Sequence, residues 1–230
     1  MAQRPIFIPL GSAPWVRQRM VAFTWHAGMA LSQKQKSITS LHSAARSLLH
    51  LSTILEISSK SKDPEGVAAS AFNLIIELPD GVRAPLECAY QGSKKFTSGG
   101  PHTDIYCGTA LDAKRDERVK GQGGRLVSFD YFGLSWPLEP VSLFYDWLYV
   151  SALTQPQNGA LLAQLLAYEA FTDIEFNPEK SVSCQANSAA LIVGMSRAGL
   201  DLTGATEPSG FRTLVAGSLR LSGEGQAQLF

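Results

Sequence analysis

The sequence predicts a single α+β domain over residues 1–230, mostly helical and with a small sheet. Its 230 residues are enough for one full-sized hydrophobic core and few for two. Apolar residues make up 45% of the chain and charged residues 17%, which is typical of a globular domain and not of a disordered chain. Segments with helical periodicity alternate with short strand-like runs, and neither an internal repeat nor a linker divides them.

Residues 1–55 are expected to form an N-terminal extension of this domain, of which residues 1–24 are extended chain. A helix is predicted over residues 33–51, with Ser32 as its N-cap. Its apolar residues recur at steps of three and four and define one face: Ile38, Leu41, Ala45, Leu48 and Leu49. Lysines in the first turn oppose the helix dipole, an unfavourable arrangement unless an anion lies nearby.

The following segments are expected to be shorter. Strands are predicted over residues 53–58 and 70–78, with a loop over 59–66 between them and a tight turn at Pro79-Asp80-Gly81. A helix is predicted over residues 86–96. The remaining patterns predict helices over 111–120, 141–153, 160–170 and 185–198, strands over 125–132 and 171–176, and a loose tail over 204–230 that is rich in Gly and Ser.

The charge balance excludes one class of function. The chain has 20 basic and 20 acidic side chains, so its formal net charge is zero. Tight nonspecific binding to a nucleic-acid backbone requires a basic excess, whereas a local basic pocket for a small phosphorylated ligand is compatible with this composition.

The cysteines and the N-terminus indicate a cytoplasmic protein. Cys88, Cys107 and Cys184 are far apart and form no CxxC pair, so we expect reduced thiols without a disulfide framework or a zinc site. The apolar stretch near the N-terminus is broken by Pro5 and Pro9, and is neither a signal peptide nor a membrane span. We expect no metal, no cofactor and no membrane association.

The segment most informative about chemistry runs from Ile57 to Phe96. On the helix predicted there, Glu87, Gln91 and Lys94 follow one another at steps of four and three, which places them on one face. The carboxylate can act as a base or stabilise positive charge, and the ammonium can hold a phosphate or act as a nucleophile. A solvated Glu–Lys ladder on a helix surface explains the same spacing.

The block from Glu56 to Phe96 resembles the NADAR family. The matching residues are Pro64-x-Gly66, Ser70-Ala71-Phe72, Asp80-Gly81 and the run from Glu87 to Lys94, ECAYQGSK. Looser similarity continues to Leu191, through AKRDER at 113–118, Trp136, FYDW at 144–147 and FTDIE at 171–175. The chain departs from the family at Ala71, where the family has Asn, and at Cys88, where it has His. The segment 176–191 replaces the family's D-x-x-W-G.

Residues 23–42, FTWHAGMALSQKQKSITSLH, resemble the NADAR branch encoded beside DarT-type toxins, which ADP-ribosylate DNA bases. This resemblance implies a hydrolase that removes ADP-ribose from guanine and acts as an antitoxin. Its implied partners are ADP-ribosylated guanine in nucleic acid and a cognate DarT-type toxin.

The resemblance implies that Glu87 is the catalytic carboxylate, which stabilises positive charge on the anomeric carbon or activates water. Lys94 and Lys114 either contact the diphosphate or attack the opened ribose as Schiff-base nucleophiles. Asp173 and Glu175 are expected to alternate on a strand and face opposite ways, and of the two we expect Glu175 in the site. The expected catalytic residues are Glu87, Lys94 and Glu175, and the expected substrate-binding residues are Lys60, Ser61, Gln91, Lys114, Arg118 and Trp136.

Several of these residues have a structural alternative. Glu87 at a helix start also complements the helix dipole, and lysines often lie in solvent. Trp136 is either a stacking surface for a base or an anchor of the core. Two other functions also remain open: an N-glycosidase acting on a phosphorylated intermediate of the riboflavin pathway, and a module that binds ADP-ribose or a toxin without turnover.

Overall fold

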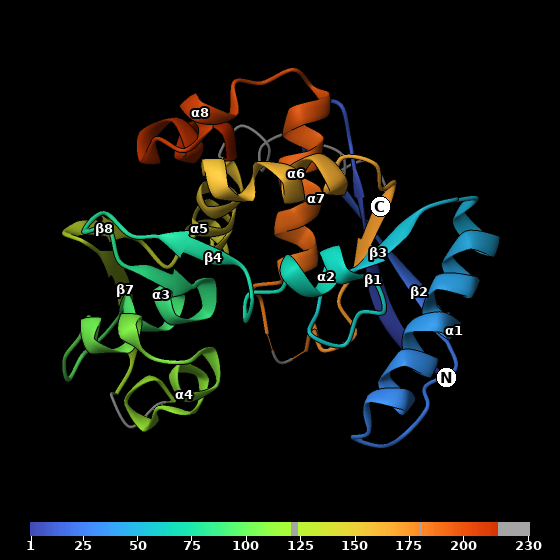
Figure 1. Ribbon diagram of the computed structural model, residues 1–230, viewed down its shortest axis with the longest axis horizontal. Helices are drawn as coiled ribbons and strands as arrows, with labels where there is room; N and C mark the ends of the chain where they lie inside the picture. Colours follow the sequence, from blue (N-terminus) through green and yellow to red (C-terminus); the bar gives the residue numbers. More distant parts are fainter. Residues whose placement is uncertain (121–123, 180, 216–230) are drawn as a thin grey trace, which may run out of the picture.

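The computed structural model describes residues 1–120, 124–179 and 181–215. It confirms the α+β class, with helices packed around three small sheets (Figure 1). Within the described residues the sheets have the strand orders β2-β1-β9-β3, β4-β5 and β6-β7-β8. No helix in this part of the chain has the length and apolar character required to cross a bilayer.

The four-stranded sheet joins the two halves of the chain. β1 (Ala2–Pro9) and β2 (Val16–Phe23) form an antiparallel hairpin, so the expected extended segment is sheet. Next to β1 lies β9 (Ala170–Thr172), which pairs in parallel with β3 (Ile54–Glu56). In this register Glu56 lies opposite Thr172, although 116 residues separate them. The site described below is built on this edge.

Helix α1 (Leu31–Leu49) packs on one face of this sheet through three of the residues that its periodicity predicts, whereas Leu48, also predicted on that face, is exposed. Its buried Ile38, Leu41 and Ala45 join Ile6 and Val21 of the hairpin in one apolar cluster. The prediction of Ser32 as N-cap is wrong, because Ala30 occupies that position and its carbonyl already accepts the amides of residues 33 and 34.

Helix α7 (Gln185–Arg197) packs against β1 and β9, and α5 (Leu143–Thr154) packs against α7 (Figure 1). Both helices are buried over most of their length. The remaining elements are α2 (Pro64–Ala68), β4 (Ile75–Glu77), β5 (Arg83–Pro85), α3 (Leu86–Gly92), β6 (Lys94–Phe96), α4 (Ala110–Arg115), β7 (Leu126–Tyr131), β8 (Leu134–Trp136), α6 (Gly159–Leu165), α8 (Leu202–Ala205) and the 3-10 helices Thr103–Cys107, Glu117–Val119 and Pro156–Asn158.

Several predicted elements are shorter in the structure. The helix predicted over 86–96 ends at Gly92, because Lys94–Phe96 pairs with β7 as a strand. The strand predicted over 70–78 is confined to Ile75–Glu77, and α2 begins within the loop predicted over 59–66. The helix predicted over 111–120 ends at Arg115. In the expected loose tail, residues 208–215 are helical with Phe211 buried, and residues 216–230 lie outside the described residues.

Candidate active site

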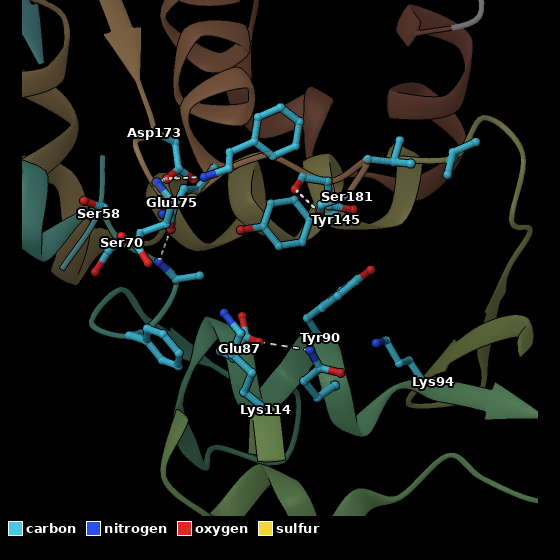
Figure 2. Close-up of a pocket in the computed structure, with 18 of the residues that line it drawn as sticks. Ser58, Ser70, Glu87, Tyr90, Lys94, Lys114, Tyr145, Asp173, Glu175 and Ser181 are labelled. Carbon is cyan, nitrogen blue, oxygen red and sulfur yellow. Dashed lines mark hydrogen bonds between the residues drawn. The ribbon is translucent and has the colours of Figure 1, made fainter. Parts of the chain in front are cut away.

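A cleft of about 740 Å³ lies between the α3–β6 segment and the chain that follows β9 (Figure 2). Its volume is within the range of small-molecule sites in proteins. The lining residues come from segments that are distant in sequence: 58–60, 70–72, Glu87, Tyr90, Gln91, Lys94, Lys114, Leu126, Phe129, Leu138, Glu139, Val141, Tyr145, Asp173, Glu175, Phe176, 181–183 and Gln185.

Glu87 is held on one wall by the backbone around α3. Its amide donates to the Ala71 carbonyl oxygen at 2.9 Å, which ties the first turn of α3 to the Ser70–Phe72 segment. The side chain is only 9% exposed and lines the cleft. Gln91, one turn later, donates from Nε2 to Glu87 Oε1 at 2.9 Å. Gln91 Oε1 is buried without a partner among the described residues and is therefore available to accept a hydrogen bond from a ligand.

Lysines give the cleft its positive charge. Lys94 leaves the helix and lines the cleft from β6, with its Nζ 5.1 Å from the centroid of the Tyr90 ring. Burial lowers the pKa of Lys94, and the charge of Glu87 partly opposes that shift. Lys114 Nζ lies 5.2 Å from the ring centroid of Phe72, and Lys60 lines the cleft from the loop after β3. Together these three ammonium groups suit a diphosphate.

Asp173 and Glu175 lie on the wall opposite Glu87 (Figure 2). The expectation that they face opposite ways is wrong, because β9 ends at Thr172 and both side chains line the cleft. Asp173 Oδ1 accepts the amides of Glu175 at 3.0 Å and Phe176 at 3.1 Å, and these bonds turn the chain out of the sheet. Glu175 pairs with Lys34 of α1, N to O 2.9 Å, so a carboxylate offsets the cationic first turn of that helix.

Behind Asp173 lies a buried hydrogen-bond chain. Thr172 Oγ1 donates to Glu56 Oε2 at 2.6 Å, and the Ile174 amide donates to Glu56 Oε1 at 2.8 Å. His42 Nε2 lies 2.8 Å from Thr172 Oγ1. Because the only hydroxyl proton of Thr172 goes to Glu56, His42 is the donor in this contact.

Burial governs the titration of these groups. It raises the pKa of Glu56, and together with the charge of Glu56 it raises the pKa of Asp173 to about 8. The pKa of His42 is lowered to about 4, first by burial and then by the charges of Arg46 and Lys62. Near neutral pH the Asp173–Glu56 pair therefore retains a proton, and His42 is neutral.

Aromatic rings form the floor of the cleft beside Lys94. The ring of Tyr90 lies 5.4 Å from that of Phe129 and 5.0 Å from that of Tyr145, and all three residues line the cleft. Flat apolar surfaces of this kind suit a nucleobase. Tyr90 stands between Glu87 and Gln91 in the motif and Tyr145 in the FYDW run, so both could have been identified from their neighbours.

Six of the nine expected site residues line one cleft: Lys60, Glu87, Gln91, Lys94, Lys114 and Glu175. Three do not. Ser61 is buried under α2, where its Oγ accepts the Asp63 amide. Arg118 is bound to Asp104 and Asp116 at 2.7 and 2.6 Å away from the cleft. Trp136 is fully buried, with its ring 4.6 Å from that of Trp147, and anchors the core.

Sequence reasoning placed Asp173 outside the site and did not identify Tyr90, Tyr145, Ser70 or Gln185, all of which line the cleft. Within residues 1–120, 124–179 and 181–215, no group of three His, Cys, Asp or Glu side chains is arranged to hold a metal ion.

The family model described as "DarT1-associated NADAR antitoxin" matches residues 2–220 of the chain. No curated protein matches it.

Proposed function

Because the chain belongs to the family of DarT1-associated NADAR antitoxins, we propose that it is an N-glycosidase that removes ADP-ribose from guanine in nucleic acid. The family gives it an antitoxin role and a toxin as its counterpart. The proposed reaction reverses the modification made by that toxin. We propose that this reaction takes place in the cytoplasm.

The observation that carries this proposal is the position of Glu87. A carboxylate that is 9% exposed lines a cleft of about 740 Å³ together with three lysines. Departure of a base from ribose builds positive charge on the anomeric carbon. A carboxylate held beside that carbon stabilises the charge or takes a proton from the attacking water.

The remainder of the cleft suits the rest of the ligand. Lys60 and Lys114 line the cleft and suit contacts with the diphosphate of ADP-ribose, and the rings of Tyr90, Phe129 and Tyr145 suit a base. Gln91 Oε1, buried and unpartnered in the described structure, is an acceptor for an amino group.

Lys94 has two possible roles in this scheme. It either contacts the diphosphate or, because its pKa is lowered by burial, attacks the carbonyl carbon of the opened ribose. Borohydride reduction during turnover separates the two roles. A covalent adduct that forms on the wild-type protein and not on Lys94→Arg identifies the nucleophile, and absence of an adduct assigns Lys94 to binding.

The direct test is release of ADP-ribose from ADP-ribosylated guanosine and from a DNA oligonucleotide that carries the same modification. We expect release by the wild-type protein and a loss of at least about 100-fold in kcat for Glu87→Gln. Glu117→Gln is the matched control, because Glu117 is exposed and lies outside the cleft. No release by the wild-type protein, or equal release by Glu87→Gln, contradicts the proposal.

The same assay separates the alternative functions. Hydrolysis of a phosphorylated N-glycoside of the riboflavin pathway, without activity on ADP-ribosylated guanine, would place the enzyme in that reaction. Tight ADP-ribose binding without hydrolysis of either substrate would identify a binding module.

A further inference from the structure

We propose that Asp173 is the general acid of this site, holding one proton with Glu56 behind it and giving that proton to the nitrogen of the departing base. The inference rests on the proposed function and adds a second acid–base group to Glu87. It also changes the expected division of roles, in which Glu175 was the second carboxylate of the site.

The backbone places Asp173 for this role. The parallel register of β3 and β9 sets Glu56 beside Thr172, the residue immediately before Asp173. Asp173 is 6% exposed and lines the cleft on the wall opposite Glu87 (Figure 2). Two backbone amides bind its Oδ1 and fix the orientation of the carboxyl group. In an inverting hydrolysis the attacking water and the leaving group lie on opposite faces of the sugar, so the acid is needed on the wall opposite Glu87.

The charges around Asp173 favour a shared proton. Glu56 is 1% exposed, and among the described residues no ion pair reaches either carboxyl group. The groups that face Asp173 from neighbouring elements carry no positive charge: Glu56 of β3, Tyr145 and Tyr149 of α5, Cys184, and Gln185 of α7. Two desolvated carboxyl groups this close do not both ionise readily. The raised pKa of Asp173, about 8, agrees with this geometry.

Glu175 is in a different position, because Lys34 is bound to it at 2.9 Å. The Glu175 carboxylate therefore already has an ionic partner, whereas no ion pair reaches Asp173 among the described residues. Of the two acids on this wall, Asp173 is therefore the donor, and Glu175 ties α1 to the edge of the cleft.

The proposed step is balanced. As the bond between the anomeric carbon and the base nitrogen breaks, its electron pair passes to the nitrogen, which takes the proton of Asp173. Water adds to the anomeric carbon and gives a proton to Glu87. The products are the unmodified guanine, still part of the nucleic acid, and ADP-ribose, with Asp173 ionised and Glu87 protonated. Proton exchange with solvent restores both groups, and water is the only co-reactant.

The pH dependence of kcat tests this role. Asp173 acts in its protonated form, so kcat falls as the pH rises through its pKa. We expect Glu56→Gln to move this falling limb at least one pH unit lower, since it removes the neighbouring carboxyl group. Asp173→Asn should lower kcat at least about 100-fold and leave the Kd for ADP-ribose unchanged. Asp146→Asn is the matched control, because Asp146 is also a buried carboxyl group with a raised pKa but lies outside the cleft.

A second measurement detects the protonation of Asp173 directly and does not depend on turnover. In protein labelled with ¹³C-aspartate, the carboxyl resonance that is missing from Asp173→Asn should titrate in the wild-type protein with a midpoint near 8. A midpoint near 4, or a falling limb that Glu56→Gln does not move, would overturn the role of Asp173 alone. Absence of ADP-ribose release by the wild-type protein would overturn the proposed function itself.

Discussion

Gln91 Nε2 donates a hydrogen bond of 2.9 Å to Glu87 Oε1 from one turn further along α3. The two residues are four apart, so the helix presents both side chains on the face that lines the cleft. The bond fixes one carboxylate oxygen and leaves the other without a partner among the described residues. The orientation of the proposed catalytic carboxylate therefore depends on this amide.

Gln91→Leu should consequently lower kcat for ADP-ribose release by about tenfold, the effect of losing one hydrogen bond of about 1.4 kcal/mol to a charged group. Steady-state kinetics measure this effect, and Gln157→Leu on the exposed 3-10 turn is the control. An unchanged kcat in Gln91→Leu would show that Glu87 is oriented without Gln91.

Lys94 and Lys95 are neighbours on β6 and offer a matched pair. Lys94 lines the cleft, and Lys95 is exposed and does not. Lys94→Gln should weaken ADP-ribose binding at least about tenfold, since it removes a partly desolvated charge from an anion site. Lys95→Gln should leave the Kd unchanged. Titration calorimetry measures both, and equal Kd values for the two variants would exclude Lys94 from ligand binding.

His42 makes stability depend on pH. Its pKa is about 4 in the folded protein, below the ordinary value of 6.5. Above pH 6.5 neither state binds the proton, so the stability is complete. As the pH falls toward 4, the unfolded state takes up the proton first, and up to about 3 kcal/mol is lost. His42→Gln, which can still donate to Thr172, should show a smaller loss between pH 6.5 and 4 in urea unfolding. Parallel curves for the two proteins would contradict this assignment.

Trp136 is expected to act on stability and not on binding. It is fully buried beside Trp147 and Phe144. Trp136→Phe should lower the free energy of unfolding by about 1–3 kcal/mol and leave the Kd for ADP-ribose unchanged. Phe129→Leu is the comparison, because Phe129 lines the cleft and its loss should weaken binding. Weaker binding by Trp136→Phe would restore its predicted role as a stacking surface.

A glycine is required at position 66 because the backbone of Glu56 and the side chain of Ser61 pass close to it. A Cβ atom there would overlap with the Glu56 carbonyl oxygen and the Ser61 hydroxyl. Gly66→Ala should therefore destabilise the fold by about 1–3 kcal/mol and disturb the Glu56–Asp173 region. Gly159→Ala, at a helical position with open space around it, should be neutral or stabilising. Thermal unfolding compares the two, and equal midpoints would show that the backbone at Gly66 can move aside.

The sequence patterns predicted the elements that depend on neighbouring residues, and missed those that depend on distant partners. Helices α1, α5 and α7 were identified by their apolar residues, and the motif from Glu87 to Lys94 identified the wall of the cleft that one segment builds. Lys94 was placed on a helix because its spacing is helical, whereas pairing with Phe129 of β7 draws it into a strand. Such pairing depends on a partner more than 30 residues away, which periodicity does not report.

The position of Asp173 also depends on long-range contacts that the sequence pattern does not report. Alternation along a strand assigned it away from the site, but the strand ends at Thr172 once Asp173 accepts two backbone amides. Its raised pKa results first from burial and then from the charge of Glu56, which the parallel pairing of β3 and β9 brings beside Thr172. Arg118 suited phosphate binding by its chemistry, yet two aspartates nearby already occupy its guanidinium group.

The pairing of β3 with β9 also constrains how activity is gained and lost in the cell. Strand β9 is synthesised long after β3, so a nascent chain carries Glu87 but lacks Asp173 until the later segment leaves the ribosome. Any cut that opens the pairing of β3 with β9 would separate the two walls in the same event. We therefore expect protection against the toxin to be all-or-none for each molecule, with no partly active fragments, and its duration to be set by the lifetime of intact chains.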